Sequence, residues 1–403
     1  MTTSPTTATG PTRIDIRRAR VALLAVFAAH GALFGSWAPR IPGVKSALGL
    51  SAGSLGFALL APAAGSLLAM PLAGAAAARF GSGPTTRALL AAYCILPWTI
   101  GLAGDLPRLW FALFGVGAAL GSLDVVMNAQ GVTIERAAGR PVMSGFHAGW
   151  SVGALGGTAL GSAGAALHVP LATQLGVLGA VLLVLGWLLS ARLLPDPVGT
   201  TRQPAFARPS RRLLALGVAA FACLVCEGAA ADWSAVHLRD SLGAAAGVAG
   251  VAYVAFTAAM TVGRMAGDRV VARFGRAATV TALGALGTAG MAGGLGSHTV
   301  PGAIIGFGLL GAGLSAMVPT LFGAAGDTSN GGTAGPAIAA VSTCGYFGML
   351  AGPPLIGGIA QGAGLSAALW VIPVLTATAA VLGRRAVRSG PVGRPVPPNI
   401  ITA

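Results

Sequence analysis

The chain has 403 residues, of which 55% are hydrophobic, only 9% are charged and 63 are glycine. A soluble protein of this length carries roughly 25% charged residues, so the composition excludes an ordinary soluble globular domain. The net charge of +15 would suit a nucleic-acid partner, but the basic residues fall in short loops on one predicted side, which is the orientation signal of membrane proteins. We therefore expect an all-α membrane protein in contact with lipid, and no nucleic acid.

Apolar runs long enough to cross a hydrocarbon core of about 30 Å as helices recur along the whole chain. Small residues within them suit close helix packing, because lipid supplies no hydrophobic force between helices. The first run continues to about Trp37 without a small-residue cleavage site, so it is predicted to be a span and not a cleaved leader. Twelve spans are predicted, at residues 20–38, 52–77, 88–104, 109–134, 145–168, 171–194, 213–233, 245–267, 277–296, 301–325, 336–360 and 366–383.

An even number of spans places both ends of the chain on one side of the membrane. Basic residues at that side greatly outnumber those opposite, which are Arg40, Lys45, Arg108 and Arg239. Because positively charged loops stay in the cytoplasm, both termini are predicted to be cytoplasmic in a multi-pass protein of the inner membrane. The residues on the cytoplasmic side are Arg13 to Arg20, Arg79, Arg87, Arg136, Arg140, Arg192 to Arg212, Arg269 to Arg276 and Arg384 to Arg394.

A polar, proline-rich segment at residues 195–212 divides the chain, since such sequence cannot bury an apolar face. It separates a six-span half at residues 20–194 from a second at 213–383, and cytoplasmic tails remain at 1–19 and 384–403. Two short motifs recur about 195 residues apart, as expected for repeated halves that build a site at their interface. They are Ala78-Arg79-Phe80-Gly81 with Ala272-Arg273-Phe274-Gly275, and Leu48-Gly49 with Leu242-Gly243. The predicted fold is two pseudo-symmetric six-helix bundles.

This organisation, with an arginine-containing loop after the second span of each half, resembles the major facilitator superfamily. The superfamily's loop signature runs Gly, three residues, Asp-Arg, and then Gly. The first half has Gly74 and Arg79-Phe80-Gly81 but Ala78 in place of the Asp, and the second half keeps Asp268-Arg269 with the spacing shifted by one residue. The resemblance implies a secondary transporter that works by alternating access.

The fourth predicted span resembles fucose permease-like transporters more closely. Asp124-x-x-x-Asn128 matches their acid-x-x-x-Asn element, and Ser144-Gly145-Phe146-His147 resembles a related bacterial branch. In fucose permease the acid serves proton coupling and sugar binding, with an Asp near the outer end of the first helix as its partner. Residues 35–40 contain no such acid here. The resemblance implies a sugar-like or other polar solute as substrate and protons as the coupling ion.

Four polar residues inside predicted spans are candidates for proton coupling or substrate binding. A carboxylate in hydrocarbon costs roughly 3 kcal/mol or more, so Asp124 and Glu227 require a reason to be there. Asn128 lies one helical turn from Asp124 on the same face, and the pair is either functional or a structural link to another helix. No basic residue at mid-span depth is predicted to pair with Glu227. His30 is either a titrating group or a satisfied buried histidine.

A second set of candidates is predicted to gate the cytoplasmic side. Asp268 and Arg269 end the eighth predicted span, where an acid can bind the N-terminal end of a neighbouring helix and a nearby arginine. Arg79 holds the matching place in the first half, and His147 lies about one turn inside the fifth span. The alternative for the loop residues is a cluster of charges that only sets membrane orientation.

Other functional classes have little support. Cys223-x-x-Cys226 lacks the further ligands of a metal site, and no phosphate-binding G-x-x-x-x-G-K-[ST] motif occurs, Lys45 being the one lysine. No cofactor or metal is expected, and the protein is predicted to be a monomer and not an enzyme, since its candidate residues come from different spans. Efflux of amphipathic compounds, an intramembrane enzyme and a non-transporting sensor remain the alternatives.

Overall fold

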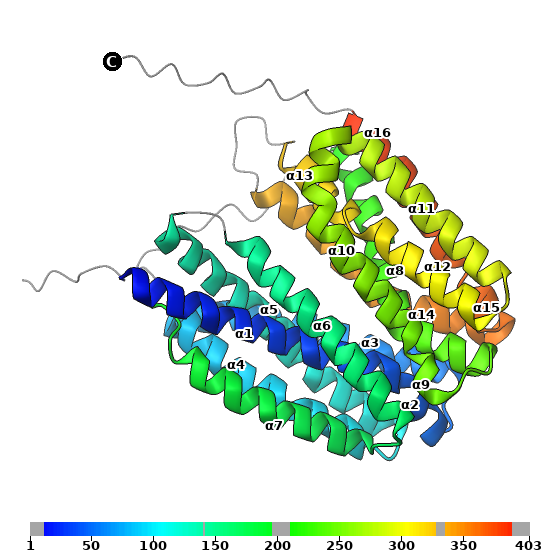
Figure 1. The fold of residues 1–403 in the computed structure, drawn as a ribbon, viewed down its shortest axis with the longest axis horizontal. Helices are drawn as coiled ribbons and strands as arrows, with labels where there is room; N and C mark the ends of the chain where they lie inside the picture. Colours follow the sequence, from blue (N-terminus) through cyan, green and yellow to red (C-terminus); the bar gives the residue numbers. More distant parts are fainter. Residues whose placement is uncertain (1–11, 140–141, 196–209, 328–334, 389–403) are drawn as a thin grey trace, which may run out of the picture.

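The computed structural model describes residues 12–139, 142–195, 210–327 and 335–388, and within these ranges the regular structure is entirely helical (Figure 1). The first group of helices is α1 (Arg13–Trp37), η1 (Ala38–Arg40), α2 (Ile41–Ala47), α3 (Ala52–Phe80), α4 (Ser82–Ile95), η2 (Leu96–Leu102), α5 (Leu106–Ala138), α6 (Met143–Ala166) and α7 (Leu171–Ser190). The second group is α8 (Arg211–Val236), η3 (His237–Ser241), α9 (Ala246–Ala249), α10 (Val251–Phe274), α11 (Arg276–Gly296), α12 (Val300–Leu314), α13 (Met317–Gly326), α14 (Gly335–Ala363), α15 (Leu365–Ala368) and α16 (Val371–Arg388). The all-α prediction is confirmed.

Nine helical segments of the described chain are long and apolar enough to cross a membrane, by length and composition. This confirms a multi-pass membrane protein. The other three predicted spans coincide with α4 and η2, with α6 and with α14, so the count of twelve stays a prediction. The predicted linker and both tails lie largely outside the described residues, although α1 and α16 extend a few residues into the predicted tails.

Helices within each group approach one another at the distance of backbone contact. A Cβ atom added to Gly31 of α1 would lie 2.1 Å from the carbonyl oxygen of Trp150 in α6. A Cβ atom added to Gly153 of α6 would lie equally close, 2.1 Å, to the carbonyl oxygen of Ala28 in α1. Only glycine permits this crossing, which is how membrane helices gain packing energy without a hydrophobic force between them.

The repeated Ala-Arg-Phe-Gly motif has the same local structure in both groups. Gly81 ends α3 with φ of 89°, and Gly275 ends α10 with φ of 78°, a conformation that glycine adopts without a steric penalty. Each guanidinium lies over the phenylalanine next in sequence, 5.2 Å from the ring centroid for Arg79 and 5.6 Å for Arg273. The sequence repeat is therefore also a repeat of backbone and side-chain geometry.

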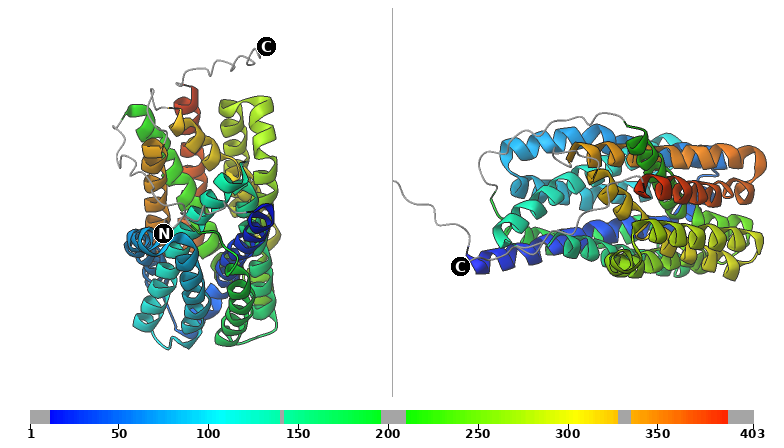
Figure 2. Two further views of the ribbon diagram at one scale, coloured as in Figure 1. Left: turned by 90° about the vertical axis from the view of Figure 1, so that its left-hand side faces the viewer. Right: turned by 90° about the horizontal axis from the view of Figure 1, so that it is seen from above.

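The two groups lie side by side and touch at one end (Figures 1 and 2). At that end Lys45 Nζ lies 2.5 Å from Asp240 Oδ2, and a Cβ atom on Gly56 of α3 would lie 2.7 Å from the carbonyl oxygen of Pro353 in α14. Toward the other end the groups diverge, so that the start of α1 and the end of α16 are far apart (Figure 1). The diverging end carries the predicted cytoplasmic loops.

Candidate functional site

The acid of the fourth predicted span is half-buried in the middle of α5. The side-chain amide of Asn128 donates to the main-chain oxygen of Asp124 at 2.8 Å and to its Oδ1 at 3.2 Å. The two side chains therefore lie together, as their spacing predicts. No cation lies within salt-bridge distance of Asp124 among the residues that the structure describes.

Glu227 of α8 has a partner that the sequence-based interpretation missed. Arg264 Nη2 lies 3.3 Å from Glu227 Oε1, and the side chains are 33% and 23% exposed, respectively. The prediction that no basic residue at mid-span depth serves Glu227 is therefore wrong. Arg264 lies near the end of the span predicted at residues 245–267, whereas α10 continues to Phe274 and places it in the helix interior.

Two further side chains lie within electrostatic range of these charged groups. His147 of α6 interacts electrostatically with both Asp124 and Arg264. Tyr346 of α14 does so with both Asp124 and Glu227. These five residues, Asp124, His147, Glu227, Arg264 and Tyr346, are called the central polar cluster below. The first two belong to the first group of helices and the others to the second.

The side chains of the central polar cluster are not fully buried. His147 and Tyr346 are exposed, and the other three side chains are half-buried. It contains two carboxyl groups but only one guanidinium, together with an imidazole and a phenol. A carboxylate in this position within a membrane protein is costly unless it binds a proton, a cation or a hydrogen-bonding solute.

His30 is held by hydrogen bonds within the first group. The Trp150 indole donates to its Nδ1 at 2.8 Å, and its Nε2 lies 3.2 Å from the main-chain oxygen of Leu120. An indole N–H can only donate, so Nδ1 accepts, the proton is on Nε2, and the ring is neutral. Both ring nitrogens thus have hydrogen-bond partners. This favours the interpretation of His30 as a satisfied buried histidine over that of a titrating group.

The structure describes the side chains of three of the four candidate gating residues, namely Arg79, Arg269 and His147. Arg79 is exposed at the end of α3, and Arg269 is exposed with its Nη1 donating to the Met265 carbonyl at 3.5 Å. Asp268 and Arg269 lie inside α10 and not in a loop, which corrects the predicted end of that span. The side chain of Asp268 lies outside the described part of the structure, so its latch role stays a prediction. His147 belongs instead to the central polar cluster.

Metal ligands do not cluster in the described residues, where no group of three or more His, Cys, Asp or Glu side chains could hold an ion. Cys223 and Cys226 are buried and free, and the Cys226 thiol lies 3.5 Å from the carbonyl oxygen of Ile372. The Cys-x-x-Cys spacing therefore serves helix packing.

Comparison with known proteins decides the family. An uncharacterized MFS-type transporter of Yersinia pestis is 38% identical over 368 residues, which cover 91% of this chain and 94% of that protein. A family model described as Major Facilitator Superfamily matches residues 215–401. The chain belongs to the major facilitator superfamily. Membrane protein MosC of Rhizobium meliloti is also similar, with 35% identity over 351 residues, covering 86% of this chain and 84% of MosC.

Solved structures of transporters share this fold. A bacterial homologue of the human lysosomal transporter Spinster, inward-facing and occupied, matches with a TM-score of 0.74 and 13% identity, covering 94% of this chain and 98% of its own. The nucleoside transporter NupG matches with a TM-score of 0.69 and 14% identity, covering 92% and 99%. These likenesses show the fold, and membership of the superfamily makes the chain a membrane transporter and not an enzyme. The finer resemblance to fucose permease stays a prediction.

Proposed function

We propose that this superfamily member is a secondary active transporter that moves a small polar, sugar-like solute across the inner membrane, coupled to protons. The observation that carries the proposal is the central polar cluster, because it is built from helices of both groups. A site at such an interface changes its access when one group moves against the other.

The proposed transporter is a monomer with twelve spans in two pseudo-symmetric halves and with cytoplasmic termini. The matching geometry after Arg79 and Arg273 supports the repeat. The contacts near Lys45 and Gly56 hold the halves together at the predicted outer end. In this proposal the conformation is one that is open toward the cytoplasm, and alternating access requires these contacts to break as the opposite end closes.

Coupling is proposed to run through the two carboxylates. Asp124 takes up a proton or accepts hydrogen bonds from the solute, and Asn128 orients it. Glu227 holds Arg264 in the second half. A proton on Glu227 removes the charge that holds the guanidinium, so Arg264 becomes free to attract Asp124 across the space between the halves. Closure at the cytoplasmic end would bring these two groups nearer.

The proposal is tested with purified protein in proteoliposomes under an imposed pH gradient. Radiolabelled sugars, polyols and nucleosides are offered in turn, since hydroxyl-rich solutes fit a cluster of carboxylates, imidazole and phenol. Accumulation of one class that collapses when a protonophore dissipates the gradient is expected. Transport at the same rate with and without the pH gradient would refute proton coupling. Preferential transport of amphipathic dyes would favour efflux as the function.

A further inference from the structure

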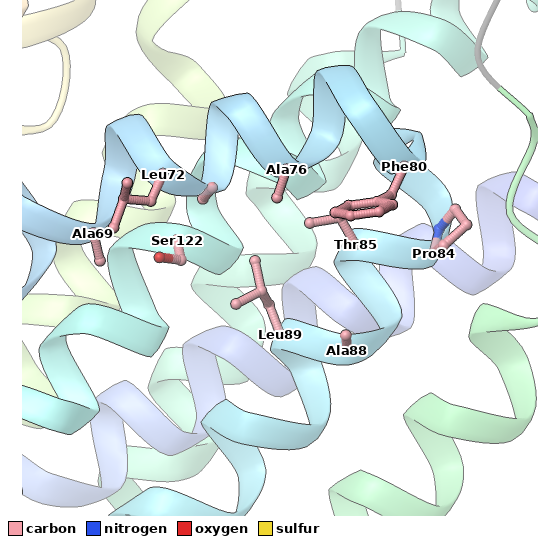
Figure 3. A pocket seen from close by; sticks show the side chains of 10 residues that line it. Ala69, Leu72, Ala76, Phe80, Pro84, Thr85, Ala88, Leu89 and Ser122 are labelled. Carbon is pink, nitrogen blue, oxygen red and sulfur yellow. The ribbon is translucent and has the colours of Figure 1, made fainter.

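An apolar groove opens on the first group, between α3, α4 and α5 (Figure 3). Its volume is about 660 Å³. Ala69, Ala73 and Ala76 of α3 form one wall, Ala88 and Leu89 of α4 form the other, and Ser122 of α5 lies at the back. None of these residues belongs to the central polar cluster, so the groove is separate from the proposed transport site.

The groove exists because one face of α3 carries small side chains. Ala69, Ala73 and Ala76 follow one another at helical spacing, so their methyl groups leave room that larger residues would fill. The rim is formed by Leu72 and Phe80, which are 71% and 63% exposed. Large apolar side chains exposed to this degree on a membrane-spanning helix are expected to contact lipid.

A cation lies beside the groove. Arg79 is exposed at the end of α3, and its guanidinium lies 5.2 Å from the ring centroid of Phe80, which lines the groove. The groove itself is lined by no charged residue. It therefore combines an apolar interior with a guanidinium at the end that is predicted to face the cytoplasm, where anionic lipids attract basic residues.

We propose that this groove binds a single anionic phospholipid, with an acyl chain along the alanines of α3 and the phosphate at Arg79. A polar solute would find only the hydroxyls of Ser122 and Thr85, whereas an acyl chain requires no hydrogen-bonding partner. The guanidinium matches a phosphate in charge and in the geometry of its donors. This inference depends on the membrane location and not on the transport mechanism.

The test measures lipid retention and thermal unfolding of the full chain in detergent. Wild-type protein is expected to retain phospholipid in native mass spectrometry, and its Tm is expected to rise more with added phosphatidylglycerol than with phosphatidylcholine. Ala76→Leu fills the groove and should lose most of that rise. Ala75→Leu is the matched control, because Ala75 is exposed on the same helix but does not line the groove.

Two further variants keep the test decisive. Ala88→Leu fills the groove from α4 and replaces Ala76→Leu if that variant does not fold. Arg79→Gln should abolish the preference for phosphatidylglycerol while retaining a response to phospholipid. An unchanged lipid response in both filling variants, or an equal loss in Ala75→Leu, would overturn the proposal. So would a lipid-free dimer that the filling variants disrupt, since a second copy of the chain would then be the occupant.

Discussion

Asp124 and Glu227 are both membrane carboxylates, but their surroundings differ. Asp124 has an amide neighbour in Asn128, at 3.2 Å, whereas Glu227 faces the guanidinium of Arg264 at 3.3 Å. Breaking the pair of Glu227 and Arg264 leaves one partly buried charge without its partner, whereas Asp124 has no ion pair to lose among the described residues. The two acids are therefore expected to respond differently to substitution.

Asp124→Asn is expected to abolish proton-driven accumulation of substrate in proteoliposomes while leaving substrate exchange measurable. Asparagine forms hydrogen bonds, but its amide cannot take up and release a proton as a carboxyl group does. The measurement is uptake under a pH gradient compared with counterflow at equal pH. Asp105→Asn is the control, because Asp105 caps α5 from a loop and asparagine caps equally well. Full accumulation by Asp124→Asn would remove Asp124 from the coupling mechanism.

Arg264→Gln is expected to stop transport and to destabilise the protein by about 1–2 kcal/mol, since it leaves Glu227 without its counter-charge in a partly buried site. The double variant Glu227→Gln/Arg264→Gln should regain most of that stability but no transport. Thermal unfolding in detergent and counterflow measure the two effects separately. If both variants unfolded at the wild-type temperature, the ion pair would have no structural role.

At the scale of elements, the crossing of α1 and α6 depends on Gly157 but not on its neighbour Gly156. A Cβ atom on Gly157 would lie 2.0 Å from the carbonyl oxygen of Ala32, whereas one on Gly156 would have no neighbour within 4 Å. Gly157 thus faces the backbone of α1, whereas Gly156 faces open space. The same crossing carries Trp150 to His30, so helix separation and the neutral state of that histidine are linked.

Gly157→Ala is consequently expected to push α1 and α6 apart and to lower stability by about 1–3 kcal/mol, the usual cost of overpacking. Gly156→Ala adds the same methyl group to the same helix and should be neutral or slightly stabilising, because alanine favours the helix. Thermal unfolding of the two variants in one detergent makes the comparison. Equal stabilities would show that the crossing tolerates a wider separation than its geometry implies.

At the scale of the whole molecule, the contacts at the predicted outer end hold the two groups in the observed arrangement. Lys45 and Asp240 pair across the groups, and the side-chain oxygen of Gln361 accepts from the Gly53 N–H at 3.0 Å. Lys45 lies near the end of α2, and Asp240 lies in η3, the short helix that follows α8. Opposite charges on two short helices thus meet where the two groups touch.

Lys45→Ala is expected to shift the population toward conformations open at the outer end. Spin labels or cysteine accessibility at the two ends measure the shift, and the exchanged pair Lys45→Asp/Asp240→Lys should reverse it. Arg108→Ala is the matched control, because its ion pair with Asp105 is exposed and stays within one turn of α5. An identical change in both variants would indicate a general charge effect and not a contact between the groups.

The sequence alone predicted the all-α membrane fold and the superfamily, and both predictions are confirmed. Hydrocarbon thickness dictates helix length, so apolar runs revealed membrane helices without any knowledge of packing. The Asp124 and Asn128 pair was also predictable, because residues four apart in one helix share a face. Gly81 and Gly275, which both have positive φ angles, occupy the same place in the two copies of the repeated motif. The sequence repeat therefore indicated that they share a structural role.

Only the tertiary structure decided which side chains face one another. The rotation and length of α10 place Arg264 against Glu227, and no local pattern records that pairing. Trp150 of α6 and Leu120 of α5 each satisfy one ring nitrogen of His30, while the start of α6 carries His147 to the central polar cluster. Contacts between helices distant in sequence depend on how glycines and large residues interlock in three dimensions, and a single span contains only its own half of each contact.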